Sequence, residues 1–408
     1  MNGRMLRLAA GAALAIATLV PVARAQPGGG GPFGGGQMGP SVSTRDLETY
    51  AGMLGMDEGQ RELAMALFES YRDSIEAEAQ KFRDAMEDAR AEFQQTQDRS
   101  AFEGVREQGE AYQQRRENLE QTFFSDVKSL LTPEQEQAWP KVERAHRRNT
   151  TLQRGLMSGE RVDLVQIASE VEVGDNPRVT AALGLYEVDL DRVLVRRNQV
   201  IEDAFGQVRE LFEDGDQDRI ERVFDNARDA SKQVRDVNRR YADQIAALLD
   251  AEKAAAFRAA VQEAALPRVY RPTQASRALD AAMGFEDLTE NQKAAVQALK
   301  DRYDGQLAPL NAQLAREIEK AEEDADARTF MRMRFQRGGQ QGRGGRGGDD
   351  DGTRELMDKR RDLDRQTLDL LSETLTEAQI ERLPRPEPQR DAGGRQRGGQ
   401  AARGRDIN

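Results

Sequence analysis

The chain has 408 residues, of which 32% are charged and only 5% are aromatic, and its formal net charge at neutral pH is -12. This composition favours long, solvated helices with narrow apolar stripes over one thick core, and the acidic balance argues against a general nucleic-acid-binding protein. The absence of cysteine excludes a disulfide framework, a thiol nucleophile and a lipid-modified cysteine anchor.

The first 25 residues have the pattern of a secretory signal peptide. Arg4 and Arg7 precede an apolar run over residues 8–20. Residues 23–25 read Ala-Arg-Ala, the small-x-small pattern of a cleavage site. The apolar run is too short to span a membrane. We therefore expect cleavage after Ala25 and a periplasmic or secreted protein without a transmembrane segment.

A Gly-rich segment, residues 26–42, follows, and its composition predicts a flexible linker. Helical periodicity begins at about Ser43. Over residues 57–96, apolar side chains recur at steps of three, four and seven, which predicts one long helix with a single apolar face. A second stripe over residues 102–130 predicts a returning helix. Residues 43–150 therefore form a predicted antiparallel helical hairpin with short helices at its ends.

The same plan returns over residues 151–270 and residues 271–386. In the third unit an Arg/Gly-rich insertion, residues 336–352, separates the two apolar stripes. The C-terminal tail, residues 387–408, has a similar composition, and we expect both segments to be flexible. The Arg-Gly runs resemble RNA-binding segments in composition, but an exported protein does not meet nucleic acid, so we expect no nucleic-acid partner.

Three tyrosines mark the register of the repeat. Tyr71, Tyr186 and Tyr303 follow one another at spacings of 115 and 117 residues, and such self-similarity predicts tandem copies of one unit. Tyrosine at this position is expected in the core with its hydroxyl at the edge. Gly, Pro and basic residues place the breaks between units at Arg147–Gly159 and Pro267–Thr273. The predicted fold is all-α, with three tandem helical hairpins.

A short motif, Leu-Thr-x-x-Gln, recurs where helices are expected to begin. Its Thr and Gln form a capping box, in which the Thr hydroxyl accepts from the backbone N–H three residues on and the Gln side chain accepts from the Thr N–H. We therefore interpret the motif residues as structural helix caps. They are Leu131, Thr132 and Gln135; Leu288, Thr289 and Gln292; and Leu375, Thr376 and Gln379.

The first unit opens with a degenerate copy of the motif, Met56–Gln60, in which Asp57 is the cap, and it closes with the full copy, which Trp139 follows soon after. A cysteine-free helical unit that follows a signal peptide and carries the motif at both ends resembles the Spy/CpxP family of periplasmic proteins, which is also named after its LTxxQ motif. The resemblance covers residues 43–386 as three tandem copies. The second unit departs from the pattern, because Val171–Asp175 stands where the first motif would open and Asp250–Lys253 where the second would.

The resemblance implies an all-helical, cradle-shaped protein. Spy-like members act as ATP-independent chaperones, CpxP-like members also damp an envelope-stress sensor kinase, and some relatives bind zinc, copper or nickel. Family members are dimers, but self-association of a three-unit chain stays open. The resemblance thus implies unfolded or envelope proteins as clients, and a sensor ectodomain as a further partner.

Catalysis and metal binding are not indicated by the residues. The single histidine, His146, lies in a basic stretch that we expect to be exposed, whereas transition-metal sites favour His and Cys ligands. The cluster Met331–Met333 is expected to be core or linker methionine. Three adjacent acids, Asp349–Asp351, do not fix a Ca²⁺ coordination geometry in a Gly-rich loop. We therefore expect no enzymatic activity, no cofactor and no specific metal site.

The leading hypothesis is an exported chaperone or envelope-stress protein that binds unfolded chains on amphipathic helical surfaces. Candidate client faces are the apolar halves of the long helices, such as Phe82, Met86 and Phe93, each of which also fits a place in the hairpin core. The alternatives are a structural spacer of the cell envelope and a negative regulator that docks on a sensor ectodomain.

Overall fold

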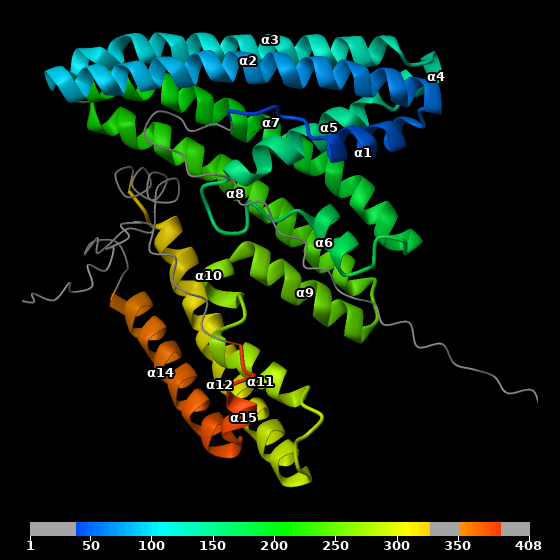
Figure 1. The fold of residues 1–408 in the computed structure, drawn as a ribbon, viewed down its shortest axis with the longest axis vertical. Coiled ribbons are helices and arrows are strands. Elements are labelled where there is room, and N and C mark those ends of the chain that lie inside the picture. Colours follow the sequence, from blue (N-terminus) through cyan, green and yellow to red (C-terminus); the bar gives the residue numbers. More distant parts are fainter. Residues whose placement is uncertain (1–37, 215, 327–350, 385–408) are drawn as a thin grey trace, which may run out of the picture.

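The computed structural model describes residues 38–214, 216–326 and 351–384, and every regular element in these ranges is a helix. This confirms the predicted all-α class. Three pairs of long helices form the frame, and the two helices of each pair pack along one another (Figure 1). The predicted signal peptide, most of the predicted linker and insertion, and the predicted tail lie outside the described residues.

The first long pair consists of α2 (Glu58–Thr96) and α3 (Glu103–Ser129), joined by a 3₁₀ turn, η1 (Arg99–Phe102). Helix α2 matches the long helix predicted over residues 57–96. The ring of Tyr71 in α2 stacks on Phe123 in α3 with centroids 4.9 Å apart. Aromatic residues therefore hold the two helices together along the apolar face that the sequence spacing predicts.

Short helices cover the end of the first pair: α1 (Thr44–Leu54), α4 (Pro133–Glu136) and α5 (Trp139–Thr151). Trp139, Val142 and Ala145 of α5 are buried against α1 and α3. The aromatic residue that follows the motif is thus a core residue. Immediately before α1, Val42 is also fully buried, so the last residues of the predicted linker pack against this first pair.

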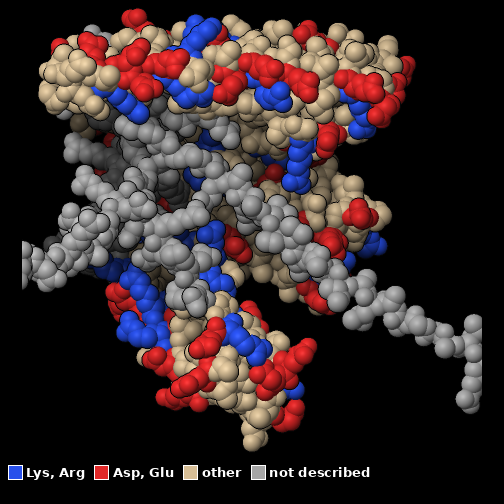
Figure 2. Space-filling view, in the orientation of Figure 1, with Lys and Arg blue, Asp and Glu red and all other residues tan. Residues whose placement is uncertain are grey.

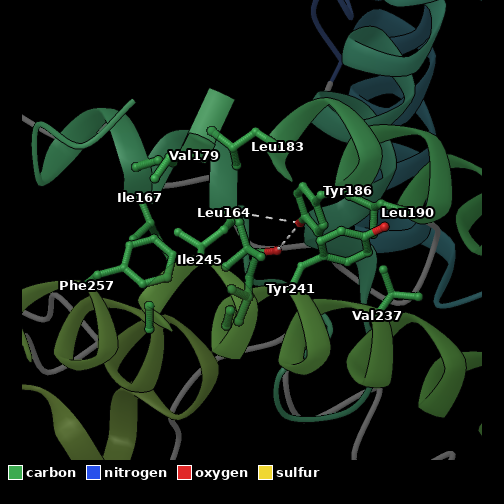
Figure 3. Packing of buried hydrophobic residues seen from close by; sticks show 14 of the residues in the cluster. Leu164, Ile167, Val179, Leu183, Tyr186, Leu190, Val237, Tyr241, Ile245 and Phe257 are labelled. Carbon is green, nitrogen blue, oxygen red and sulfur yellow. Dashed lines mark hydrogen bonds between the residues drawn. The ribbon is translucent and has the colours of Figure 1, made fainter. Parts of the chain in front are cut away.

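The second long pair is α7 (Pro177–Asp214) and α8 (Gln217–Ala247), flanked by α6 (Leu164–Glu170) and α9 (Ala251–Ala265). Its core draws on all four helices, and Tyr186 and Phe257 are fully buried there (Figure 3). Tyr186 meets Tyr241 of α8 edge to face, with centroids 5.6 Å apart.

The third long pair is α12 (Glu290–Glu323) and α14 (Asp351–Thr374). Figure 1 shows it projecting away from the first two pairs. The short helices that accompany it are α10 (Pro267–Tyr270), α11 (Gln274–Met283) and α15 (Glu377–Ile380).

The stretch predicted as the first break between units, Arg147–Gly159, is not an exposed linker. Arg148 lies inside α5, is 7% exposed, and pairs with Asp163 and Glu187 of the second unit. After a short 3₁₀ turn, η2 (Leu152–Arg154), the loop from residue 155 to residue 162 is mostly buried between helices.

Two features of this loop fix its course. Gly159 has a φ of +82°, and a Cβ there would lie 2.9 Å from Cγ of Arg235, so only glycine fits. Glu160, which is fully buried, accepts hydrogen bonds from the backbone N–H groups of Leu156 and Met157 and pairs with the guanidinium of Arg197 at 3.1 Å. The loop is thus held inside the protein by hydrogen bonds and a buried ion pair.

The same loop joins the third long pair to the second. Ser158 donates from both its backbone N–H and its hydroxyl to the buried carboxylate of Glu322 near the end of α12, each at 2.8 Å. Arg235 of α8 pairs with Glu323 at 2.9 Å, and Arg239 of α8 pairs with Glu319. The contacts that this loop and α8 make with α12 are therefore largely ionic or polar.

Candidate functional site

The motif glutamines of the first unit meet face to face. Thr132 and Gln135 form the predicted capping box at α4, and Asp57 and Gln60 form another at α2. The side-chain amide of Gln60 donates to Oε1 of Gln135 at 2.8 Å, and the amide of Gln135 donates to Oε1 of Gln60 at 2.9 Å. The start of the hairpin is thereby joined to its end, a contact we call the glutamine clasp.

Each glutamine of this clasp uses all of its hydrogen-bonding groups. The second amide N–H of Gln60 reaches the carbonyl of Leu130 at 2.7 Å, and that of Gln135 reaches the carbonyl of Gly55 at 3.0 Å. Each Oε1 also accepts from the backbone N–H of its own N-cap residue. The pair therefore closes the open end of the hairpin, where helix ends leave unpaired carbonyls.

The third unit contains a second glutamine clasp. Gln292 of the α12 capping box donates to Oε1 of Gln379 at 3.1 Å and to the carbonyl of Thr374 at 3.0 Å. Gln379 of the α15 capping box donates to the carbonyl of Asp287 and is only 3% exposed. The three motif threonines and three motif glutamines thus form helix caps at the ends of the helix pairs, and each motif leucine directly precedes its cap threonine.

The second unit has a hollow in the corresponding place. Asp250 caps α9 by accepting from the backbone N–H of Lys253 at 2.9 Å, and no glutamine is present in either motif position. A cavity of about 420 Å³ opens here between the starts of α7 and α9. Its lining residues are Glu172, Val173, Asp175, Asn176, Pro177, Leu249, Asp250 and Lys253.

Each of the three tyrosines that mark the register makes a hydrogen bond to the segment that leads into a short helix. The hydroxyl of Tyr71 accepts from the backbone N–H of Ser41 at 3.2 Å, that of Tyr186 donates to the carbonyl of Val162 at 3.2 Å, and that of Tyr303 bonds the hydroxyl of Thr273 at 2.6 Å. Each partner lies at or just before the start of the short helix that precedes the hairpin. Burial is the main reason that the pKa values of all three hydroxyls are raised.

Removing a cap is expected to weaken the end of the first pair. Thr132→Ala should lower the free energy of unfolding by about 1 kcal/mol, the usual cost of a lost N-cap. Gln135→Ala should cost more, because it removes the cap partner and the clasp together. Thermal unfolding of residues 26–408 measures both changes, with the exposed Glu134→Ala as control. Unchanged midpoints in both variants would contradict the structural role.

His146 is not the exposed side chain that its basic neighbours predict. Its side chain is 14% exposed. Its Nε2 donates to the carboxylate of Glu120 at 3.0 Å, and its Nδ1 lies 3.3 Å from the hydroxyl of Tyr50. Glu120 also accepts from the hydroxyl of Ser41. The cluster joins α1, α3 and α5 to the chain segment that leads into α1.

Acid should weaken this cluster. Burial tends to raise the pKa of Glu120, but hydrogen bonds from His146 and Ser41 outweigh burial and leave that pKa below its ordinary value of 4.5. A carboxyl whose folded pKa is depressed stabilises the fold at neutral pH, and this contribution is lost as pH falls through the folded pKa. Between pH 6 and pH 3, the unfolding free energy should fall less in Glu120→Gln than in the wild type. Equal falls would exclude this role for Glu120.

The predicted client faces lie largely within the first hairpin. The ring of Phe82 stacks on Tyr112 of α3 with centroids 5.7 Å apart, and Phe93 meets Phe102 at 5.6 Å. Met86 is half-buried on the same helix. These aromatic rings are used for pairing the two helices, so the structure does not present them as a free surface.

Sequence reasoning did not identify an exposed apolar stripe on the second pair. Leu185, Val188 and Val195 of α7 are 64%, 43% and 47% exposed. The signal was present in the sequence, since these residues lie opposite the helix face that carries Tyr186. The spacing that predicts the core face of this helix leaves these three residues outside it, but spacing alone does not show whether another helix covers them.

Of the segments weighed as metal ligands, Met331–Met333, Asp349 and Asp350 lie outside the described residues. Within the described ranges, no group of three or more His, Asp or Glu side chains is arranged to hold a metal ion. None of the helices in these ranges is both long and apolar enough to cross a membrane.

No protein-family model matches this chain, and no match is found among curated proteins or solved structures.

Proposed function

We propose that the protein is an exported, ATP-independent chaperone or envelope-stress protein of the Spy/CpxP kind. It would be delivered by the N-terminal signal peptide to the periplasm or the exterior, and it would bind unfolded or envelope proteins on the surfaces of its long helices. Binding would be weak and reversible, because the surfaces interleave apolar and charged groups.

The observation that carries this proposal is the glutamine clasp. The resemblance depends on paired cap motifs, Thr-x-x-Gln twice in the third unit and Asp57-x-x-Gln60 with Thr132-x-x-Gln135 in the first. In both units the two motif glutamines are hydrogen-bonded to one another. A chance pair of helix caps has no reason to meet in this way. The contact supports the interpretation that each motif pair delimits one structural unit, and that the chain consists of three tandem units of this kind.

The surface of the first pair supports the proposal as well. Figure 2 shows Lys and Arg side chains interspersed with Asp and Glu along α2 and α3. Such a surface attracts clients of either charge over a short range, because the opposite charges cancel at a distance. The same surface suits a holding function better than selection of one folded partner.

A structural spacer of the cell envelope is the second candidate. It is favoured by the arrangement of the long pairs, the third of which projects from the other two (Figure 1). A spacer needs length and stiffness, and it does not need a surface that binds unfolded chains.

Aggregation of a denatured client separates the two candidates. Residues 26–408 are added without nucleotide to a chemically denatured model protein at stoichiometric ratios, and light scattering is followed over time. The control is an unrelated helical protein of similar negative charge. We expect suppression well above that of the control. Scattering equal to the control would remove the chaperone proposal and leave the spacer.

A further inference from the structure

The solvent face of α7 carries three exposed apolar side chains in a line. Leu185, Val188 and Val195 are large, exposed apolar side chains, and their spacings of three and seven residues place them on one line of the helix. Tyr186 and Leu190, on the opposite side of α7, are buried in the core of the second pair (Figure 3). The exposed apolar residues are therefore separate from the face of α7 that packs against α8 in the hairpin core.

Among the described residues of the other two long pairs, no such line of large exposed apolar side chains is found. Aligned on the three tyrosines, Ala64, Val179 and Val296 correspond, and all three are buried, which supports the register. At the register positions of the stripe, the first and third pairs carry polar or small residues. These are Ser70, Asp73 and Gln80 in α2, and Arg302, Gly305 and Ala312 in α12. The common architecture thus does not require large apolar residues at these places.

Two exposed arginines place positive charge beside these apolar residues, although the chain as a whole is acidic. Arg192 lies between Val188 and Val195 and is 75% exposed. Its nearest carboxylate among the described residues is that of Asp189 at 3.5 Å, which is closer to Arg240 of α8, at 2.7 Å. Arg196 follows on the same side and is exposed, and no ion pair to it is found in the described parts of the chain.

We propose that this α7 face, defined by Leu185, Val188, Arg192, Val195 and Arg196, binds an acidic, amphipathic polypeptide segment. Apolar side chains of the segment would cover the stripe, and its carboxylates would pair with the two arginines. The proposal names a client class for the chaperone and so rests on the function proposed above.

The charges beside the stripe favour a polypeptide over an anionic membrane. Glu187 and Asp191 are partly exposed on one side, where they pair with arginines of α5, and Asp189 lies on the other side. Because each of these carboxylates is already paired with an arginine, only Arg192 and Arg196 among the described residues of this face are left to attract an anion, which is fewer than the roughly four to eight basic residues typical of sites that bind anionic membranes. A single segment can place its own carboxylates over Arg192 and Arg196 and keep clear of the flanks.

Two labelled synthetic peptides of about 20 residues, long enough for five helical turns, test the proposal. Both carry leucines at helical spacing, with glutamate at all other positions in one and lysine in the other. Fluorescence anisotropy with residues 26–408 should show the glutamate peptide binding more tightly. Leu185→Ser/Val188→Ser/Val195→Ser should weaken this binding about tenfold or more, as removal of a central apolar patch does. Arg192→Glu/Arg196→Glu should reverse the preference between the peptides.

Matched controls use similar residues elsewhere. Leu63→Ser removes a 56% exposed leucine from α2, and Arg72→Glu reverses an exposed arginine of the same helix. Both should bind as the wild type does. Equal binding by the α7 variants and the wild type would overturn the proposal. So would binding to phosphatidylglycerol vesicles that depends on the α7 residues while the glutamate peptide does not bind.

The same variants separate this inference from the general function. If the wild type and the triple serine variant suppress client aggregation equally, the chaperone function holds and the α7 face is not its site. If neither suppresses aggregation but the peptide binds to α7, the chaperone function fails and the docking surface remains. Circular dichroism of each variant confirms that its helix content is retained.

Discussion

Arg197→Ala is expected to lower the free energy of unfolding by about 3–5 kcal/mol, the usual cost of removing one partner of a buried ion pair. Arg197 is 1% exposed and its guanidinium pairs with the fully buried carboxylate of Glu160. It also donates to the carbonyl of Thr151 at 2.7 Å, where α5 ends. The variant would leave both acceptors inside the protein without this donor.

Urea denaturation followed by the fluorescence of Trp139, the single tryptophan of the chain, measures this loss close to α5. The matched control is Arg192→Ala on the same helix, since that side chain is 75% exposed and should change stability by less than about 0.5 kcal/mol. Replacing both members by neutral side chains, as in Glu160→Gln/Arg197→Met, should recover part of the loss, because no unpaired charge stays buried and the amide oxygen can still accept from the backbone N–H groups of Leu156 and Met157. Equal stabilities of Arg197→Ala and Arg192→Ala would refute the interpretation.

Glu322→Ala is expected to cost about 3 kcal/mol, because hydrogen bonds to a charged group contribute roughly 1.5–3 kcal/mol each. The buried carboxylate accepts from the backbone N–H and from the hydroxyl of Ser158, both at 2.8 Å. Since Ser158 belongs to the loop packed on α8 and Glu322 to α12, the variant should also loosen the third long pair.

Distance measurement between two spin labels tests the loosening directly. The chain has no cysteine, so Gln199→Cys in α7 and Lys293→Cys in α12 give unique attachment sites on exposed residues. The distance distribution should broaden in Glu322→Ala. It should stay narrow in Lys320→Ala, which removes an exposed side chain from the same helix. A distribution as narrow as that of the wild type would show that other contacts hold the junction.

The helix starts were predictable because a cap is a local structure. Thr132, Thr289 and Thr376 each form their capping box with the glutamine three residues on, as the motif predicts. The clasp was not predictable in the same way. Gln60 and Gln135 are 75 residues apart, and their contact depends on α3 and the turn after it returning the chain to the start of α2.

Burial of charged residues shows the same division. Arg148 and Glu160 read as solvated residues near a break between units, yet both are buried. Their burial is stabilised by partners on other helices, Asp163 for the first and Arg197 for the second. Composition and local spacing carry no information about such partners.

By itself, the sequence determined the all-α class, the long amphipathic helices and their caps, because these follow from the spacing of apolar residues and from hydrogen bonds within one turn. Only the tertiary structure decided which side chains meet at the ends of the pairs, how the loop after residue 154 is buried, and which apolar residues stay exposed. The reason is physical: these outcomes depend on contacts between helices distant in the chain. Helical spacing places Leu190 on the core face of α7 and Leu185 outside it, but only the packing of the other helices leaves Leu185 uncovered.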